Sequence, residues 1–314
     1  MNIYKHLNGE LVQLSQVEPG CWINIYPPFT HEQLVEVSEQ LDIHIDFLTD
    51  SLDVDERSRY DSDDDLDIFV INVPLKREIE DPNDLQYINI PVGVIAKPDF
   101  ILTISSFENP VINSFLKGGV RSFDTSDKSL FILQIFDKTV HFFLRYLKEI
   151  NHVINTLEKE LYDSSRNEEL AKMLLVQKSL VYFVTNLRSN EFMMMKIQRT
   201  DFLKIRDDEN KSDLLGDIIV DNSQALEMSN VYTNILNGTM DTFASIISNN
   251  LNQVMKRLTS VTILLTLPVL ISSFMGMNVP NGWEHNPFAF LAVILVSILV
   301  TVIVGVYFWR RRWF

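Results

Sequence analysis

The spacing of hydrophobic positions changes along the chain, and each spacing predicts a different kind of element. Within residues 1–125, short apolar or alternating runs bounded by turn residues are typical of strands, and short amphipathic helices separate them. The predicted strands are 3–6, 11–14, 21–26, 67–74, 87–95 and 100–105, and the predicted helices are 31–41, 45–52 and 109–117. This part is therefore expected to be a mixed α/β domain.

From residue 126 onward the spacing becomes helical. Residues 129–162 contain neither Gly nor Pro and repeat apolar side chains every three or four positions, and residues 168–199 follow the same pattern. These two helices, joined by a turn, predict an antiparallel helical hairpin over residues 126–211. A third helix is predicted to begin after Ser212 as its N-cap, and its residues 212–257 would form a cytoplasmic stalk.

Two long runs near the end of the sequence contain no charged residue. Residues 258–275 would rise ~27 Å as a helix, which matches the hydrocarbon core of a bilayer, and residues 288–309 form a second such run. We expect a first transmembrane helix at 258–275, an extracytoplasmic loop at 276–287, a second transmembrane helix at 288–309 and a basic tail at 310–314. The prediction is a multi-pass protein of the inner or plasma membrane.

Charge next to the spans predicts their orientation. The flanking basic residues are Lys256, Arg257, Arg310, Arg311 and Arg312. The loop between the spans contains no Lys or Arg, and its titratable residues are Glu284 and His285. Because basic residues favour the cytoplasmic side, both termini are expected in the cytoplasm and the loop outside.

Polar side chains follow one face of the first span. At steps of three and four residues this stripe contains Asn252, Met255, Thr259, Thr262, Thr266, Val269 and Ser273. Toward the N-terminus it continues through Ser248 and Ser245 to Asp241. One interpretation is that the hydroxyl groups pack against other helices or bond to their own backbone. The other is that the stripe lines an aqueous pore, which would need several copies of the chain.

The formal net charge of the chain is −15, and it is unevenly distributed. The five basic residues beside the spans and the single acid Glu284 give residues 256–314 a charge of +4, which leaves −19 for residues 1–255. An acidic domain argues against nucleic acid as a partner and favours cations. The lone Cys21 excludes an internal disulfide, and no nucleotide-binding or catalytic motif is present. An enzyme is therefore not predicted, and no catalytic residue is assigned.

Two clusters of acidic residues could bind divalent cations weakly, and the first of them is compared with a calcium loop. The first cluster contains Asp61, Asp63, Asp64, Asp65 and Asp67. It does not fit an EF-hand, because Leu66 stands where Gly is required and Asn72 stands where the bidentate Glu belongs. The second cluster contains Glu78, Glu80, Asp81 and Asp84. Both clusters are interpreted as solvated surface, and the first is interpreted as a turn before a strand.

The residues after the first span resemble a known family. Gly276, Met277 and Asn278 at the outer end of the penultimate span resemble the signature of the CorA family of magnesium channels. The pattern NxVMKxLT, which begins here at Asn252, is also similar to that family's pore helix. The resemblance is specific for about the last 75 residues and architectural for the rest. The following loop, VPNGWEHNPFAF, departs from the acidic and aromatic loop of many members.

The resemblance implies a funnel-shaped homopentamer with an α/β cytoplasmic domain, a long helical stalk and two C-terminal transmembrane helices. The first spans would line the pore, and Gly276, Met277 and Asn278 would form its selectivity filter. It implies influx of Mg2+, with Co2+ or Ni2+ as surrogates, driven by the membrane potential and gated by cytoplasmic Mg2+. For Asn278 the alternative is a left-handed helix cap.

Two other functions are compatible with the same sequence. A zinc transporter of the same superfamily would share the architecture, and Glu284 beside His285 in the outer loop is a zinc-type pair. A membrane-anchored coiled-coil sensor or scaffold would conduct no ions. The polar stripe argues against this scaffold, since a pure anchor needs no row of Thr and Ser on one face.

Two further features predict control of the pore. Met255 and Leu258 lie where the pore would enter the membrane, and rings of such side chains can block ions by dewetting, although helix packing is the alternative. Asp213, Asp217 and Asp221 are spaced four apart on one face of the stalk. They are predicted to bind regulatory Mg2+, with a solvated acidic face as the alternative; Asp81 and Asp84 of a neighbouring domain are candidate partners.

Overall fold

The computed structural model describes residues 1–7, 10–63, 65–78, 81, 84–164, 167–278, 282, 286–311 and 313, with the side chains of 162–164 and 167 excepted. These residues form two compact units, Met1–Thr239 (unit 1) and Met240–Phe314 (unit 2). The division falls within one long helix, α6, which runs from Glu209 to Met275.

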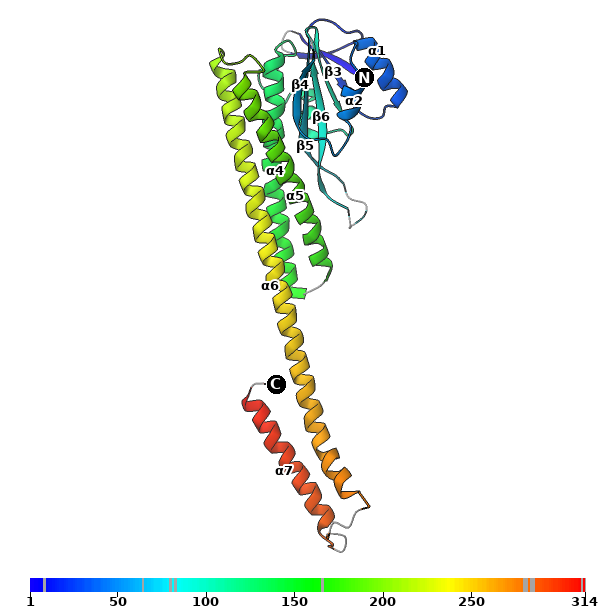
Figure 1. The fold of residues 1–314 in the computed structure, drawn as a ribbon, viewed down its shortest axis with the longest axis vertical. Helices are drawn as coiled ribbons and strands as arrows, with labels where there is room; N and C mark the ends of the chain where they lie inside the picture. The colour runs from blue at the N-terminus through cyan, green and yellow to red at the C-terminus, as the bar shows by residue number, and fades with distance from the viewer. Residues whose placement is uncertain are drawn as a thin grey trace. The chain divides into compact units, whose positions relative to one another are not determined.

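A seven-stranded mixed sheet forms the centre of unit 1 (Figure 1). Its strands are β1 (Asn2–Leu7), β2 (Glu10–Leu14), β3 (Cys21–Ile25), β4 (Arg59–Asp63), β5 (Leu66–Lys76), β6 (Tyr87–Ala96) and β7 (Phe100–Ser105). They are arranged in the order β2-β1-β3-β7-β6-β5-β4, and β3 pairs with β7 in parallel whereas the other neighbours are antiparallel. The predicted α/β fold is confirmed, with predicted strand ends within two residues of the observed ones.

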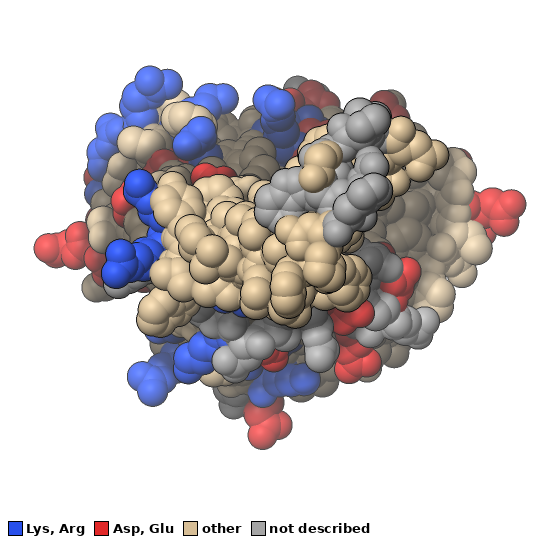
Figure 2. Space-filling model, turned by 90° about the horizontal axis from the view of Figure 1, so that it is seen from below, with Lys and Arg blue, Asp and Glu red and all other residues tan. Residues whose placement is uncertain are grey.

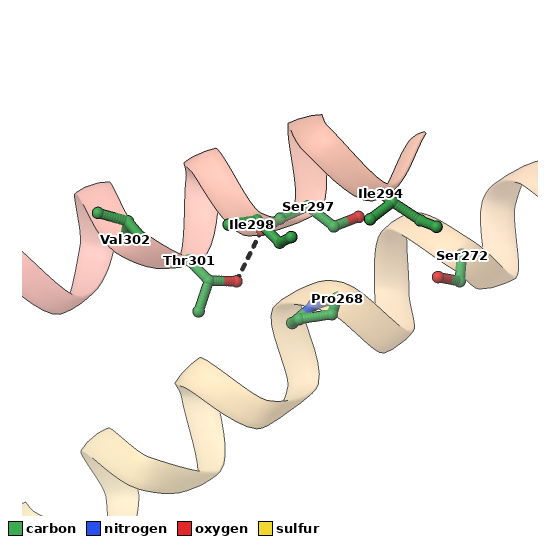
Figure 3. Close-up of a pocket in the computed structure, with 7 residues that line it drawn as sticks. All are labelled: Pro268, Ser272, Ile294, Ser297, Ile298, Thr301 and Val302. Atoms are coloured by element: carbon green, nitrogen blue, oxygen red, sulfur yellow. Dashed lines mark hydrogen bonds between the residues drawn. The ribbon is translucent and has the colours of Figure 1, made fainter. Parts of the chain in front are cut away.

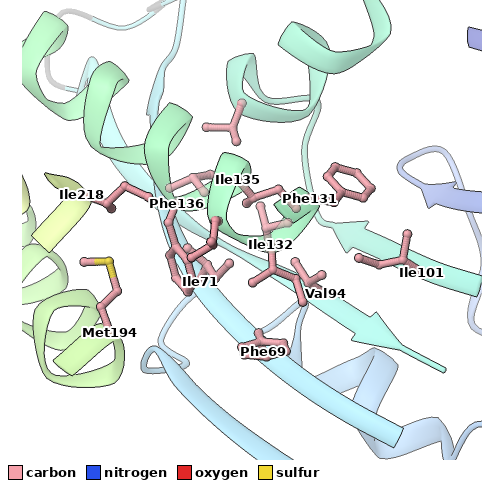
Figure 4. Packing of buried hydrophobic residues seen from close by; sticks show 14 of the residues in the cluster. Phe69, Ile71, Val94, Ile101, Phe131, Ile132, Ile135, Phe136, Met194 and Ile218 are labelled. Carbon is pink, nitrogen blue, oxygen red and sulfur yellow. The ribbon is translucent and has the colours of Figure 1, made fainter. Parts of the chain in front are cut away.

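Helices cover both faces of this sheet. Successive residues of a strand point to opposite faces, so Phe69 and Ile71 of β5 enter one apolar cluster while Ile68 enters another. The first cluster lies against the long helices α4 (Lys128–Ser164), α5 (Asn167–Thr200) and α6 (Figure 4). The second lies against α1 (His31–Leu41) and α2 (Ile45–Asp50). Since both faces are covered, β5, β6 and β7 are almost wholly apolar and buried.

Local sequence determines where the short helices begin. Thr30 accepts a hydrogen bond from the Gln33 backbone and Gln33 returns one, which makes a capping box at the start of α1. Asn109 caps α3 (Pro110–Leu116) in the same manner, by accepting from the Ile112 N–H at 3.0 Å. Gly93 in β6 allows α2 to approach, because a Cβ there would collide with the hydroxyl of Ser51.

The start of α6 differs from the prediction. Ser212 lies inside the helix, where its N–H donates to the carbonyl of Asp208 at 2.9 Å. The N-cap is Asp208, whose carboxylate accepts from the Lys211 N–H at 3.2 Å. A carboxylate both satisfies a free N–H and complements the positive end of the helix dipole, so Asp208 is the stronger cap.

The first acidic cluster also differs from the predicted turn. Asp61 and Asp63 lie in β4, opposite Ile68 and Leu66 of β5. Both side chains are exposed at the edge of the sheet, where charged residues prevent pairing with another chain. Asp64 lies outside the described residues, as do Glu80 of the second cluster and Arg312 of the tail.

Candidate ion pathway

Unit 2 consists of the end of α6 and helix α7 (Ala289–Arg310). Both helices contain an apolar window long enough to cross a membrane, and only 6% of each window is buried inside the protein. A core helix of a water-soluble protein would be mostly buried, so this exposure favours a lipid environment. Seen end-on, the near surface of unit 2 consists of residues other than Lys, Arg, Asp and Glu (Figure 2).

One face of α6 packs against α7. Ser260 of α6 is fully buried there, and Leu264 and Pro268 are partly buried on the same face. The matching face of α7 contains the small residues Ser297, Thr301 and Gly305 at every fourth position. A Cβ at Gly305 would lie 3.7 Å from Leu264 Cδ2, so the two helices approach closely at this point.

The predicted polar stripe lies on the opposite face of α6. At about 100° per residue, Thr262 and Thr266 lie about half a turn of the helix from Leu264. All seven residues of the stripe from Asn252 to Ser273 are exposed, and so are Asp241, Ser245 and Ser248 before them. The apolar and small side chains of α6 therefore meet α7, while the hydroxyl-bearing face is left uncovered within the chain.

The hydroxyl groups of the stripe bond to their own helix. Thr262 Oγ1 donates to the Leu258 carbonyl at 2.9 Å, and Thr266 Oγ1 donates to the Thr262 carbonyl at 2.7 Å. Ser245 bonds to Asp241 in the same way at 3.0 Å. Back-bonding, one of the two interpretations of the stripe, is thus present. It is compatible with an ion pathway, because a hydroxyl whose proton points into the helix still presents oxygen lone pairs outward.

A groove of about 320 Å³ lies between α6 and α7 (Figure 3). Its walls are formed by Pro268, Ser272, Ile294, Ser297, Ile298, Thr301 and Val302. Pro268 removes one helical N–H, which leaves the carbonyl of Leu264 without its usual donor on the side that faces α7. The groove is separate from the polar stripe, since none of its lining residues belongs to the stripe.

The three predicted filter residues follow directly after α6. The Gly276 N–H donates to the Ser272 carbonyl at 3.0 Å and closes the helix, and Gly276, Met277 and Asn278 are all exposed. Among the described residues, Asn278 is not one of those with positive φ. The left-handed cap considered as the alternative is therefore not adopted. Glu284 and His285 of the predicted outer loop lie outside the described residues.

Met255 and Leu258 are both exposed, at 51% and 58%. Met255 lies on the stripe. Leu258 comes three residues later, after about 300° of helical rotation, and therefore lies at the margin of the stripe. Neither side chain packs in the interior of a single chain. Their burial would need lipid or another copy of the chain.

The acids proposed as a sensor lie at the start of α6 in unit 1. Asp213, Asp217 and Asp221 are exposed, and none of them forms an ion pair within the described part of the chain. The described residues also contain no group of three or more His, Cys, Asp or Glu side chains arranged to hold a metal ion. A site with three or more such ligands here would need side chains from outside the described residues.

An ion pair fixes this end of α6 to α4. Lys211 Nζ donates to Asp127 Oδ1 at 2.8 Å and to Ser129 Oγ at 3.0 Å. Asp127 also accepts from the Leu130 N–H at 3.1 Å at the start of α4. Burial alone would raise the pKa of Asp127, but the hydrogen bonds from Lys211 and Leu130 outweigh it and hold the pKa below its ordinary value.

Sequence reasoning missed the residues that join the two spans. The signal was present in α7, where Ser297, Thr301 and Gly305 recur every fourth position, a spacing that indicates close helix packing in membranes. Ser260 on α6 gave no comparable signal, because many small and polar residues surround it. Its burial distinguishes it from the exposed hydroxyl residues of the stripe.

Comparison with known proteins agrees with this architecture. The chain is 26% identical over 300 residues to the cobalt/magnesium transport protein CorA of Methanocaldococcus jannaschii, covering 92% of this chain and 90% of the relative. It is 23% identical over 305 residues to the protein of the same name from Thermotoga maritima, covering 93% and 83%. The complete structure of the M. jannaschii CorA magnesium transporter shares the fold, with a TM-score of 0.85, 24% identity and coverage of 100% and 98%.

A family model supports the same conclusion over most of the sequence. The model of the CorA-like Mg2+ transporter protein matches residues 18–312, which include both units. This family consists of transporters rather than enzymes. The chain belongs to the family of CorA-like Mg2+ transporter proteins.

Proposed function

We propose that this chain is one subunit of a channel that carries Mg2+ across a membrane, with Co2+ and Ni2+ as surrogates. The observation that carries the proposal is the position of the polar stripe on the face of α6 that points away from α7. One chain with two spans cannot enclose a pore. A ring of five copies, with α6 inside and α7 outside, would place five stripes around one axis.

The chemistry of the stripe suits a hydrated divalent cation. Mg2+ prefers oxygen ligands and loses its water shell reluctantly. A ring of Asn278 side-chain carbonyls at the outer end of α6 would bind the ion through its waters, with Gly276 and Met277 placing the ring. Below it, the outward lone pairs of Thr266, Thr262 and Thr259 would accept hydrogen bonds from those waters.

The proposed direction of transport is inward, with both termini in the cytoplasm. The membrane potential supplies ~4.6 kcal/mol per divalent ion per 100 mV, which is enough to drive influx without ATP. A ring of Asp241 at the inner end would attract the emerging cation. Met255 and Leu258 would form a dry constriction just inside the membrane in the closed channel.

Regulation by cytoplasmic Mg2+ is part of the proposal. Asp213, Asp217 and Asp221 lack partners within the described chain, so acids of a neighbouring copy would complete the site; Asp81 and Asp84 are the candidates. Bound Mg2+ would hold adjacent subunits together and keep the pore closed. When Mg2+ falls, domains that each carry −19 would repel one another and loosen the constriction.

Ion flux into proteoliposomes tests the pore with matched variants. Thr262→Val with Thr266→Val removes two hydroxyl groups from the stripe and preserves their shape. Mg2+ flux is expected to fall about tenfold, which corresponds to about 1.4 kcal/mol of lost stabilisation along the pathway. Thr301→Val is the control, because Thr301 makes the same back-bond at 2.8 Å but lies on α7 against α6.

The outcomes separate the competing functions. Equal flux in the stripe variant and the control would exclude the stripe as the ion path. Zn2+ flux that exceeds Mg2+ flux in the unaltered protein would assign it to zinc transport. Absence of flux for every divalent ion would favour a membrane-anchored scaffold.

A further inference from the structure

The inner end of unit 2 brings basic side chains of both helices to one level. Gly305 lies against Leu264, and Thr301 shares the groove with Pro268, so α7 runs antiparallel to α6 in a fixed register. Continuing this register places Arg310 and Arg311 level with the turn of α6 that follows Lys256 and Arg257, since both helices rise ~1.5 Å per residue. Four cations, Lys256, Arg257, Arg310 and Arg311, therefore share one narrow zone.

No carboxylate compensates these cations within the described part of the chain. None of the four forms an ion pair there. The helix dipole of α7 favours Arg310 and Arg311 at its C-terminal end. It does not account for Lys256 and Arg257, which lie in the interior of α6.

Aromatic side chains hold the tail beside this zone. The Arg311 guanidinium lies 5.7 Å from the centre of the Tyr307 ring, and the Arg311 N–H donates to the Tyr307 carbonyl at 3.0 Å. Trp313 folds back and stacks on Phe308, with ring centres 5.0 Å apart and ring planes 2° from parallel. Trp309 is 73% exposed. Exposed Trp and Tyr beside Arg are typical of the boundary between hydrocarbon and head groups.

We propose that Lys256, Arg257, Arg310 and Arg311 form a binding site for the phosphate head group of an anionic phospholipid in the cytoplasmic leaflet. The lipid phosphate supplies the negative charge that the described chain does not provide at this level. Tyr307, Trp309 and Trp313 would border the head group and the start of its acyl chains. The site rests on the proposed orientation of the spans and is independent of which ion the protein carries.

Quenching of tryptophan fluorescence by brominated lipids tests the site in reconstituted full-length protein. In a Trp283→Phe background the remaining tryptophans are Trp309, Trp313 and the fully buried Trp22. Vesicles contain brominated phosphatidylglycerol or brominated phosphatidylcholine. We expect phosphatidylglycerol to be preferred about fivefold or more, since each cation near an anionic lipid surface contributes about that factor. The preference should decrease at high salt.

Variants that remove charge show which residues cause the preference for phosphatidylglycerol. Arg310→Gln with Arg311→Gln is expected to reduce the ratio several-fold, and Lys256→Gln with Arg257→Gln is expected to reduce it by a similar factor. Lys172→Gln with Lys178→Gln is the matched control, because it removes two exposed cations from α5 and should retain the full ratio. Two separate variants keep the test decisive if one of them fails to insert.

Each outcome has one meaning. Equal quenching by the two lipids in the unaltered protein overturns the site, and the basic residues then act only as an orientation signal. A ratio unchanged in both charge variants also overturns it. Absence of quenching by either lipid would refute the membrane placement itself, and therefore the proposed channel as well.

Discussion

The part of helix α6 in unit 1 and the part in unit 2 differ in which side chains they bury and which they expose. In unit 1 its buried side chains include Leu215, Ile218 and Leu236, and the buried Asn222 donates its amide to the Leu187 carbonyl at 3.0 Å. In unit 2, Leu265 and Val269 are exposed at 69% and 62%, while Ser260 is fully buried. Large apolar side chains are thus buried where α6 packs in unit 1 and mostly exposed in its apolar window, which is the reverse of what water favours.

This reversal explains why the polar stripe is informative. In water, an exposed Thr on a helix needs no explanation, because polar residues are usual at the surface. In a bilayer, exposed residues are expected to be apolar, as Leu265 is, and an exposed row of hydroxyl groups is unusual. Water on that face would make the stripe favourable, and the proposed pore would supply it.

The largest expected effect lies at the outer end of α6. Asn278→Ala should abolish Mg2+ uptake, because the ring of side-chain carbonyls that binds the hydrated ion would be lost. Asn250→Ala is the control, since Asn250 is exposed on α6 but points away from the stripe. Uptake is measured in proteoliposomes, and assembly is checked by size-exclusion chromatography in detergent. Uptake that persists in assembled Asn278→Ala protein would place the selective site elsewhere.

A smaller effect on transport is expected from substitutions in the part of α6 that belongs to unit 1. Asp217→Ala with Asp221→Ala should raise the cytoplasmic Mg2+ concentration needed for closure several-fold, because two of the proposed ligands are removed. Currents recorded against internal Mg2+ measure this shift. Glu36→Ala with Glu39→Ala on α1 removes the same charge from an exposed face and should leave the closing concentration unchanged. Identical curves for the two double variants would contradict a sensor on α6.

Much of the fold could be predicted because the hydrophobic pattern is strong where burial is complete. β5 is apolar almost throughout and was found within two residues of its observed ends, whereas the polar sequence of β4 carries no such pattern. The true N-cap of α6 was missed because Asp and Ser are both frequent at this position, so residue type alone selects neither Asp208 nor Ser212. Only the position of the helix start distinguishes them.

Part of the candidate site could likewise be predicted from the sequence, and part of it could not. The stripe followed from spacing alone, since a helix places residues three and four apart on one face. The contact between Leu264 and Gly305 needed the register of two helices, which no single-helix pattern contains. The partners of Asp213, Asp217 and Asp221 belong to other copies in the proposed channel, so neither the sequence nor the structure of one chain identifies them.

The smallest expected effect concerns the attachment of α6 to α4 in unit 1. Lys211→Met removes the ammonium that donates to Asp127 and preserves most of the apolar stem. Because the pair is partly solvated, we expect a loss of about 1 kcal/mol or less at pH 7, seen as a small decrease in the thermal midpoint of unit 1. Lys204→Met is the control, since Lys204 is exposed and forms no ion pair within the described residues.

The pH dependence of this loss identifies its cause. The folded-state pKa of Asp127 is depressed, so its contribution is fully present above the unfolded pKa of about 4 and is lost as the pH falls through the lower folded value. The unaltered protein should therefore lose its advantage over Lys211→Met as the pH is lowered below about 4. The Leu130 N–H bond to Asp127 remains in the variant, so a residual acid sensitivity is expected there. An advantage that stays constant from pH 7 to the acid limit would show that Lys211 acts through packing and not through charge.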